Sequence, residues 1–239
     1  DINHSGSDFV VEDGNIRYAL GAVKGVGEAN MRAIVAEREA HGPYKDISDF
    51  IHRTDIKQIN RRQLEQLIKA GAFDCLEKNR GRLFANVETI MRHIASSSEL
   101  KTSEQASLFG NEELHAKVKL ADKPDWPELE KLKLEAEAIG FYLSAHPLDS
   151  YGRGMERLGV KNCSEIFRNI RTGDSIRAKV AGCVNSFQKR ISKTGNKYAF
   201  LELSDASGSF EGILFSEGLA RYEEIIASGL PLFASITID

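Results

Sequence analysis

Two glycines flank a single valine in the stretch KGVGEANMRAI, just before residues with helical spacing. The first N–H groups of a helix have no acceptor inside the helix, and the helix dipole favours negative charge at that end. Gly25 and Gly27 would let the backbone come close to a ligand, and Lys24 would add a positive charge. We expect Val26 to anchor the turn in the core and Ala29 to pack closely against a neighbour. The stretch therefore predicts a site where backbone N–H groups hold a phosphate oxygen.

Three interpretations of this stretch compete. A dinucleotide site would need the third glycine of GxGxxG and a surrounding parallel βαβ pattern, and the sequence has neither. The pattern GVGEANMRAI resembles the helix-hairpin-helix motif, which binds duplex DNA through its phosphates without reading bases. The third interpretation is an ordinary loop, because a lone Gly-x-Gly is a weak signal.

The stretch IKQINRRQLEQLIKAGAFD is a candidate for a second hairpin, since such units commonly act in pairs. Asn60 can cap a helix that Gly71 would end. The residues from Gln58 to Asn60 stand where the Gly-x-Gly would be, so we expect this hairpin to contribute packing and charge rather than a backbone cradle. The charge would come from Lys57, Arg61 and Arg62. A solvated basic helix face is the alternative.

The stretch EQASLFG lies inside a polar region, residues 96–126, that we expect to be an extended linker. It resembles the clamp-binding peptide of bacterial clamp partners, in which a glutamine, two variable residues and a Leu-Phe pair follow one another, here Gln105, Leu108 and Phe109. Such a glutamine would hydrogen-bond at a pocket rim while the two apolar side chains fill the pocket. The alternative is that the Leu-Phe pair docks back on its own domain.

From Ile176 the apolar residues recur with period two, which predicts a β-rich domain. Its order is strand, basic loop, strand, a glycine turn at Ser207-Gly208, strand, a helix near residues 219–226, and a strand from Leu232. This is the order of a five-stranded OB barrel whose last strand is missing here. The predicted fold class is therefore a multidomain α+β chain, with a mainly helical helix-hairpin-helix part before a truncated OB barrel.

Charged and aromatic side chains gather around the first two strands of this domain, where OB folds grip single strands. The candidates for single-strand binding are Lys189, Arg190, Lys193, Lys197, Tyr198 and Phe200. Tyr198 and Phe200 should share a face opposite Ala199 and Leu201, and each could stack on a base for about 1 to 3 kcal/mol. A solvated hairpin tip with Phe200 buried is the alternative.

The helical part can be divided by its periodicity and its breaks. An Asp-Gly signal predicts a hairpin within residues 8–20, a helix should run from Glu28 to Gly42, and the clearest amphipathic pattern predicts one helix over 80–95. Another helix should follow Pro127. We therefore expect four parts, namely a duplex-binding part at 1–95, the linker at 96–126, a helix and connection at 127–172, and the OB domain at 173–239.

These stretches resemble one family in their order and spacing. IRYALGAVKGVGEANMRAIVAERE, LIKAGAFDCL, SLFG and EAEAIGFYLSAHPLD are similar to the C-terminal part of the alpha (polymerase) subunit of bacterial DNA polymerase III, over nearly the whole chain. The resemblance implies a helix-hairpin-helix unit on product duplex, a sliding-clamp tether, an OB domain near single-stranded template, and other replisome subunits as partners of the full-length protein. In that family the metal-binding polymerase carboxylates lie upstream, so it implies no catalytic residue, metal or cofactor in this chain, although the parent is a DNA-directed DNA polymerase.

Composition limits the function classes. The 239 residues carry a net charge of −3, so any DNA contact must come from local basic patches. The three cysteines lack CxxC spacing, which argues against a zinc site and for a reducing cytoplasm, and no apolar run is long enough to cross a bilayer. The start without Met and the end inside a β-rich run suggest a piece of a longer protein.

Two other functions stay open at this point. NAD-dependent DNA ligases and repair proteins also combine OB and helix-hairpin-helix parts, but a ligase would need zinc-spaced cysteines and an adenylation lysine motif, which we do not find. A protein-interaction scaffold would carry its basic residues only for solubility. Salt-sensitive DNA binding would exclude a scaffold.

Overall fold

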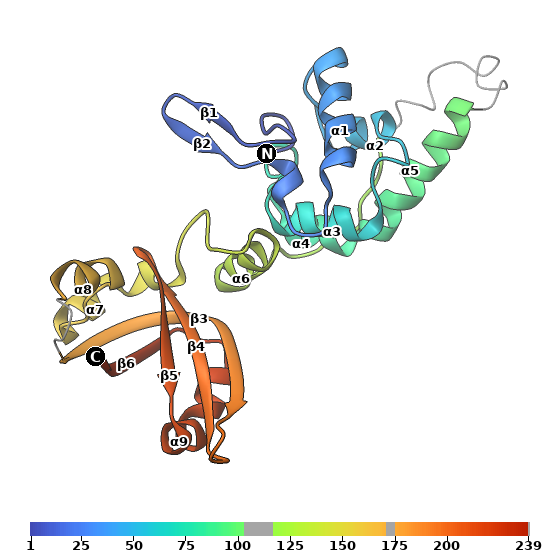
Figure 1. Ribbon diagram of the computed structural model, residues 1–239. Coiled ribbons are helices and arrows are strands. Elements are labelled where there is room, and N and C mark those ends of the chain that lie inside the picture. The colour runs from blue at the N-terminus through green and yellow to red at the C-terminus, as the bar shows by residue number, and fades with distance from the viewer. Residues whose placement is uncertain (103–116, 171–174, 239) are drawn as a thin grey trace. The chain divides into compact units, whose positions relative to one another are not determined.

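The computed structural model describes residues 1–102, 117–170 and 175–238 (Figure 1). The chain separates into two compact units, Asp1–Leu143 and Ser144–Asp239. The expected helix and connection at 127–172 contributes to both units: the helix Glu128–Ile139 belongs to the first, and the helical elements Pro147–Tyr151, Gly152–Leu158 and Cys163–Asn169 belong to the second. Among the described helices, none is both long and apolar enough to span a membrane.

The first unit begins with a β-hairpin and continues with helices. Strands β1 (Val10–Glu12) and β2 (Asn15–Arg17) pair antiparallel, and positive φ angles of 50° at Asp13 and 77° at Gly14 form the predicted tight turn. The helical elements that follow are η1 (Leu20–Ala22), α1 (Glu28–His41), α2 (Ile47–Arg53), α3 (Arg61–Lys69), α4 (Arg80–Ala85), α5 (Val87–Thr102) and α6 (Glu128–Ile139).

One apolar core holds these helices together. Met31 and Ile34 of α1, Leu64 and Leu67 of α3 and Ile90 of α5 are all 2% exposed or less. They recur every three or four residues along their helices, so each helix turns one stripe inward. The core thereby fixes the loops that join the helices.

The predicted single helix over 80–95 is wrong in one respect, because the structure breaks it at Asn86 into α4 and α5. The Asn86 amide donates to the Ala121 carbonyl at 3.0 Å and its oxygen accepts from the Ala121 N–H at 2.9 Å. The extended segment 117–126 is thus bound to the helical unit. Its Trp126 packs edge-on against Phe84, with ring centroids 5.3 Å apart.

The second unit is an antiparallel sheet with short helices before it and one helix inserted. Its elements are η4 (Pro147–Tyr151), α7 (Gly152–Leu158), α8 (Cys163–Asn169), β3 (Ile176–Ile191), β4 (Lys197–Asp205), β5 (Gly208–Leu214), α9 (Ser216–Ala227) and β6 (Leu232–Ile238). The strand order is β5-β4-β3-β6. The long strand β3 pairs with β6 through residues 176–182 and with β4 through 183–191, and the sheet curls into a half-barrel (Figure 1). This confirms the predicted fold class, a mainly helical part followed by an OB-like β domain.

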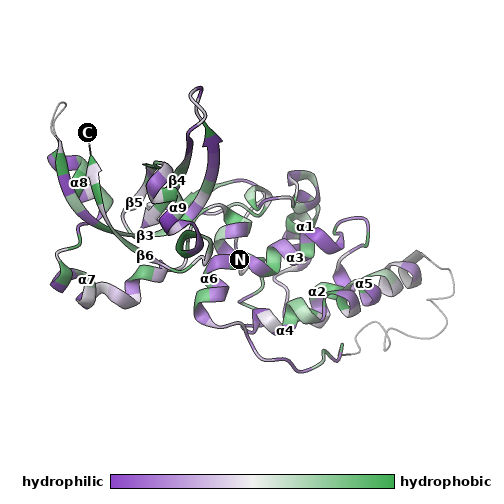
Figure 2. Ribbon diagram, turned by 90° about the horizontal axis from the view of Figure 1, so that it is seen from below, coloured by the Kyte–Doolittle hydropathy of each residue, from purple (hydrophilic) through white to green (hydrophobic). Residues whose placement is uncertain are grey.

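The two faces of the β3–β4–β5 sheet differ in burial. Ala199, Leu201 and Leu203 of β4 are 9% exposed or less, whereas their neighbours Tyr198 and Phe200 are only half-buried. We call the face that carries Tyr198 and Phe200 the outer face. Hydrophilic residues gather toward the β3–β4 hairpin (Figure 2), where the basic loop was expected.

Candidate nucleic-acid interfaces

The loop before α1, residues 24–27, has a backbone that requires glycine. Gly25 and Gly27 have φ angles of 76° and 84°, in the left-handed region that side chains disfavour. Val26 between them is 0% exposed and belongs to the core, as predicted. The loop is also held from α6, because the Lys24 N–H donates to the Ala138 carbonyl at 2.9 Å. We call these four residues the glycine loop.

The first turn of α1 is open. Gly27 is its N-cap and has no side chain to cap the helix, and among the residues that the structure describes no side chain accepts from the first N–H groups of α1. Ala29 is exposed, so the close packing expected there is wrong. The small side chain instead leaves the helix start uncovered. Lys24 is exposed beside it.

The second hairpin supports the glycine loop through one buried side chain that the sequence analysis missed. Asn60 and Gln63 form a capping box at the start of α3, in which the Asn60 N–H donates to Gln63 Oε1 at 2.9 Å. The same Gln63 donates its Nε2–H to the Val26 carbonyl, and its Oε1 accepts from Asn30 at 3.1 Å. The N-x-x-Q spacing signals the capping box, but only the fold reveals the link to Val26.

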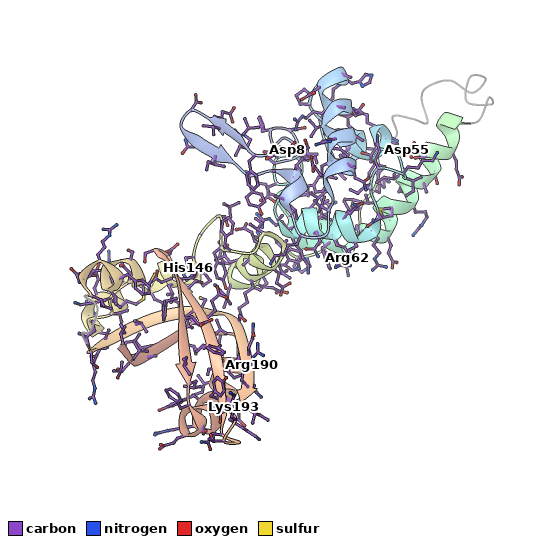
Figure 3. The ribbon with its side chains drawn as sticks, in the orientation of Figure 1. Asp8, Asp55, Arg62, His146, Arg190 and Lys193 are labelled. Atoms are coloured by element: carbon purple, nitrogen blue, oxygen red, sulfur yellow. The ribbon has the colours of Figure 1, made fainter. Side chains whose placement is uncertain are left out.

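The three basic residues expected at this hairpin have different surroundings. Arg62 lies on α3 (Figure 3). Its guanidinium lies against Gly25, since a β-carbon added to Gly25 would sit 3.6 Å from Arg62 Nε. Arg61 instead makes ion pairs of 2.8 Å with Glu65 and Glu88, and these carboxylates raise its pKa. Lys57 is exposed in the turn before α3. Among the three, the structure brings Arg62 to the glycine loop.

Gln105, Leu108 and Phe109 lie outside the described residues. Helix α5 ends at Thr102, and the described chain resumes at residue 117. The clamp-binding motif therefore stays a prediction from the sequence.

The outer face brings the two predicted aromatic residues together with one arginine. Arg190 of β3 stands opposite Tyr198 of β4 in the sheet register, and Gln188 stands opposite Phe200. The Tyr198 and Phe200 rings meet edge to face, with centroids 5.6 Å apart. Of the alternative, a solvated hairpin tip with Phe200 buried, the structure has the exposed tip at Lys193, whereas Phe200 is half-buried.

The remaining basic candidates are elsewhere around the β3–β4 hairpin. Lys189 stands opposite Ala199, so it lies on the other side of the strand from Arg190, and it makes an ion pair with Glu223 of α9. Lys197, at the start of β4, also lines a cavity of about 980 Å³ between the hairpin and α9. Lys193 lies in the hairpin turn (Figure 3). The six candidates thus surround the hairpin rather than forming one surface.

Other polar groups of the second unit have structural partners. His146 caps η4, where its Nδ1 accepts from the Leu148 N–H at 3.2 Å, and its Nε2 lies 3.3 Å from Ser204 Oγ. Burial lowers the pKa of His146, while Asp149 and Asp205 act to raise it. Within the described part of the chain, no three His, Cys, Asp or Glu residues are grouped so that they could hold a metal ion.

Known proteins resemble this chain over residues of both units. A family model described as "Helix-hairpin-helix motif" matches residues 1–83. The DNA polymerase III subunit alpha of Caulobacter vibrioides is 34% identical over 229 residues, which is 96% of this chain and 20% of that protein. The same subunit of Vibrio cholerae is 36% identical over 94% of this chain and 19% of its own length, and that of Neisseria meningitidis serogroup A is 38% identical over 88% and 18%. The chain spans about a fifth of the length of these relatives. It therefore belongs to the family of DNA polymerase III alpha subunits.

Proposed function

We propose that this chain is a non-catalytic, C-terminal segment of a replicative DNA polymerase and that its glycine loop grips duplex DNA by the backbone. The observation that carries the proposal is the uncapped start of α1 beside Arg62. The N–H groups of that first turn, the positive φ angles of Gly25 and Gly27, and the exposed Lys24 leave room and charge for a phosphate. Such contacts hold a duplex in position without reading its sequence.

Duplex binding through this loop predicts a specific dependence on salt. Each phosphate that a cation neutralises contributes about −0.9 to the slope of log K against log salt for B-DNA. The test is fluorescence anisotropy of a labelled duplex with the 239-residue chain, at several salt concentrations. Arg62→Gln and Lys24→Gln should each weaken binding and reduce the slope by about 1.

Arg61→Gln is the matched control, because Arg61 is the neighbouring arginine and is already paired with Glu65 and Glu88. It should change the slope less than Arg62→Gln does. Equal effects of both variants would mean that general basic charge, not the glycine loop, binds the duplex.

A sliding clamp is the second proposed partner, through Gln105, Leu108 and Phe109. The support comes from the sequence, since a glutamine and a Leu-Phe pair stand between α5 and the docked segment 117–126. A tether acts through effective concentration, so even weak peptide binding would keep a polymerase on its template. Calorimetry of the chain with the clamp should give binding that Gln105→Ala weakens and Leu108→Ala/Phe109→Ala abolishes, whereas Glu104→Gln should bind as the unmodified chain does.

Single-stranded template is the third proposed partner. It would bind through the outer face and through the lysines around the β3–β4 hairpin, Lys189, Lys193 and Lys197. Two half-buried rings beside an arginine suit stacked bases and a phosphate backbone. We also propose that the whole protein synthesises DNA, contacts other replisome subunits and acts in the cytoplasm. A ligase or repair origin has no specific support, because relatives that cover 88% to 100% of the chain are named polymerase subunits.

A further inference from the structure

The outer face changes in chemistry from one end to the other. The register of β3, β4 and β5 sets three rows across it, and their members are Arg190 and Tyr198, then Gln188, Phe200 and Ile213, then Ser186, Glu202 and Glu211. The first row is cationic and aromatic, the second is mainly apolar, and the third ends in two acids. A ligand lying along the strands would meet all three.

A shallow hollow of about 270 Å³ connects these rows. Its lining includes Arg190 at the cationic end, Phe200, and both Glu202 and Glu211 at the acidic end. One hollow therefore offers a cation, an aromatic ring and two hydrogen-bond acceptors. A neutral protein-docking patch would not need this combination, whereas a nucleotide has a phosphate, a flat base and polar base edges.

The positions of the two acids, Glu202 and Glu211, are unfavourable for the stability of the sheet. Glu202 and Glu211 stand directly opposite each other on adjacent strands, and like charges in that position destabilise a sheet. In the part of the chain that the structure describes, neither carboxylate makes an ion pair. Arg190 shares their hollow but hydrogen-bonds Gln188 at 3.2 Å instead. Both carboxylates are thus free to accept hydrogen bonds from a ligand.

We propose that this hollow binds one base of single-stranded DNA and selects bases that carry an amino group. The base stacks on Phe200, its phosphate lies toward Arg190, and its amino group donates to Glu202 or Glu211. This inference rests on the proposed single-strand function of the OB-like unit and adds a base preference to it.

The selectivity follows from the acceptor chemistry of the two acids. An ionised carboxylate only accepts hydrogen bonds, and the N4 amino group of cytosine is a known partner for glutamate. Uracil presents the O4 carbonyl at the same position, so two acceptors would face each other. The two pyrimidines have the same ring, so the hollow separates them by hydrogen bonding rather than by size.

The test compares labelled dC and dU 12-mers with the 239-residue chain, by anisotropy at pH 7.5 and fixed salt. The unmodified chain should bind the dC oligomer about fivefold more tightly, the low end of discrimination by a side chain that reads a base edge. In Glu202→Gln/Glu211→Gln the ratio should fall to about one, because an amide offers a donor as well as an acceptor. Both oligomers should then bind more tightly, since two negative charges are gone.

Glu217→Gln/Glu224→Gln is the matched control, since it removes the same charge from exposed positions on α9. It should keep the dC preference. If both oligomers bind equally to the unmodified chain, or if the preference survives in Glu202→Gln/Glu211→Gln, the base-selection inference is wrong while the single-strand function stands. The two acids would then act only as charges that protect the β5 strand from edge pairing. If neither oligomer binds, the single-strand function itself is wrong, and the inference with it.

Discussion

The glycine loop of the first unit offers backbone N–H groups, whereas the outer face of the second unit offers side chains. The loop is fixed from behind, because Val26 is fully buried and Gln63 holds its carbonyl. The outer face consists of half-buried and exposed side chains on a sheet. A backbone cradle suits phosphates, which are the same at every step of DNA, while side chains can distinguish bases. The comparison predicts that changes behind the loop act through folding, and that changes on the outer face act directly on binding.

The largest effect should come from Arg80, which is not one of the proposed DNA contacts. Arg80 is 6% exposed and joins Asp74, at 2.6 Å, to Glu135 of α6, at 3.2 Å. Because α6 also accepts the Lys24 N–H, this ion pair supports the glycine loop indirectly. Arg80→Leu would leave Glu135 buried without its cation, which should lower the free energy of unfolding by about 3 to 5 kcal/mol.

Trp126, the single tryptophan, lies in the first unit and reports its unfolding by fluorescence in urea. Arg92→Leu is the matched control, since Arg92 is exposed on α5 and should cost little. A loss from Arg80→Leu no larger than from Arg92→Leu would show that the buried ion pair does not hold α6 in place.

The second largest effect should come from Gln63, which supports the glycine loop but is not itself a proposed DNA contact. Gln63→Ala removes the bonds to Val26, Asn30 and Asn60 and leaves the Val26 carbonyl unpaired in the core. We expect a loss of about 2 kcal/mol in unfolding free energy and weaker duplex binding by a chain that is still folded. Gln66→Ala on the same helix is the control. Unchanged duplex binding in folded Gln63→Ala would mean that the loop does not need this support.

The sequence predicted the elements that depend on local signals. The hairpin turn at Asp13-Gly14, the Asn60 cap and the order of strands and helix along the chain in the OB-like unit follow from turn, capping and alternation rules. The break at Asn86 and the bond from Gln63 to Val26 could not be predicted, because each depends on a partner more than 30 residues away. That Lys189 and Arg190 lie on opposite sides of β3 could have been predicted, since the side chains of adjacent strand residues point to opposite faces.

On the outer face, Phe200→Leu should weaken binding with little effect on folding. Leucine keeps the half-buried apolar contact but cannot stack on a base, and one stacked base contributes about 1 to 3 kcal/mol. Binding of a dC 12-mer should therefore fall at least about fivefold, while the urea midpoint shifts slightly. Tyr222→Leu removes an exposed ring from α9 as the control. A loss of binding matched by an equal loss of stability would make Phe200 a packing residue and weaken the comparison between the two regions.

The smallest effect should be a pH dependence confined to the second unit. Because burial lowers the pKa of His146 in the folded state, the unfolded chain takes up the proton first as the pH falls. The stability that the neutral His146 contributes is complete above the ordinary histidine pKa of about 6.5. Below that pH it is lost, by no more than about 1.4 kcal/mol per pH unit. His146→Asn keeps an acceptor for the Leu148 N–H but cannot titrate in this range. Hydrogen exchange of the β4 amides, measured at pH 7.5 and 5.5, reports how often this strand opens. The increase in opening at the lower pH should be larger in the unmodified chain than in His146→Asn. An equal response in both chains would assign the pH dependence to other groups, and the same shift in the Trp126 signal would mean that the two units do not respond separately.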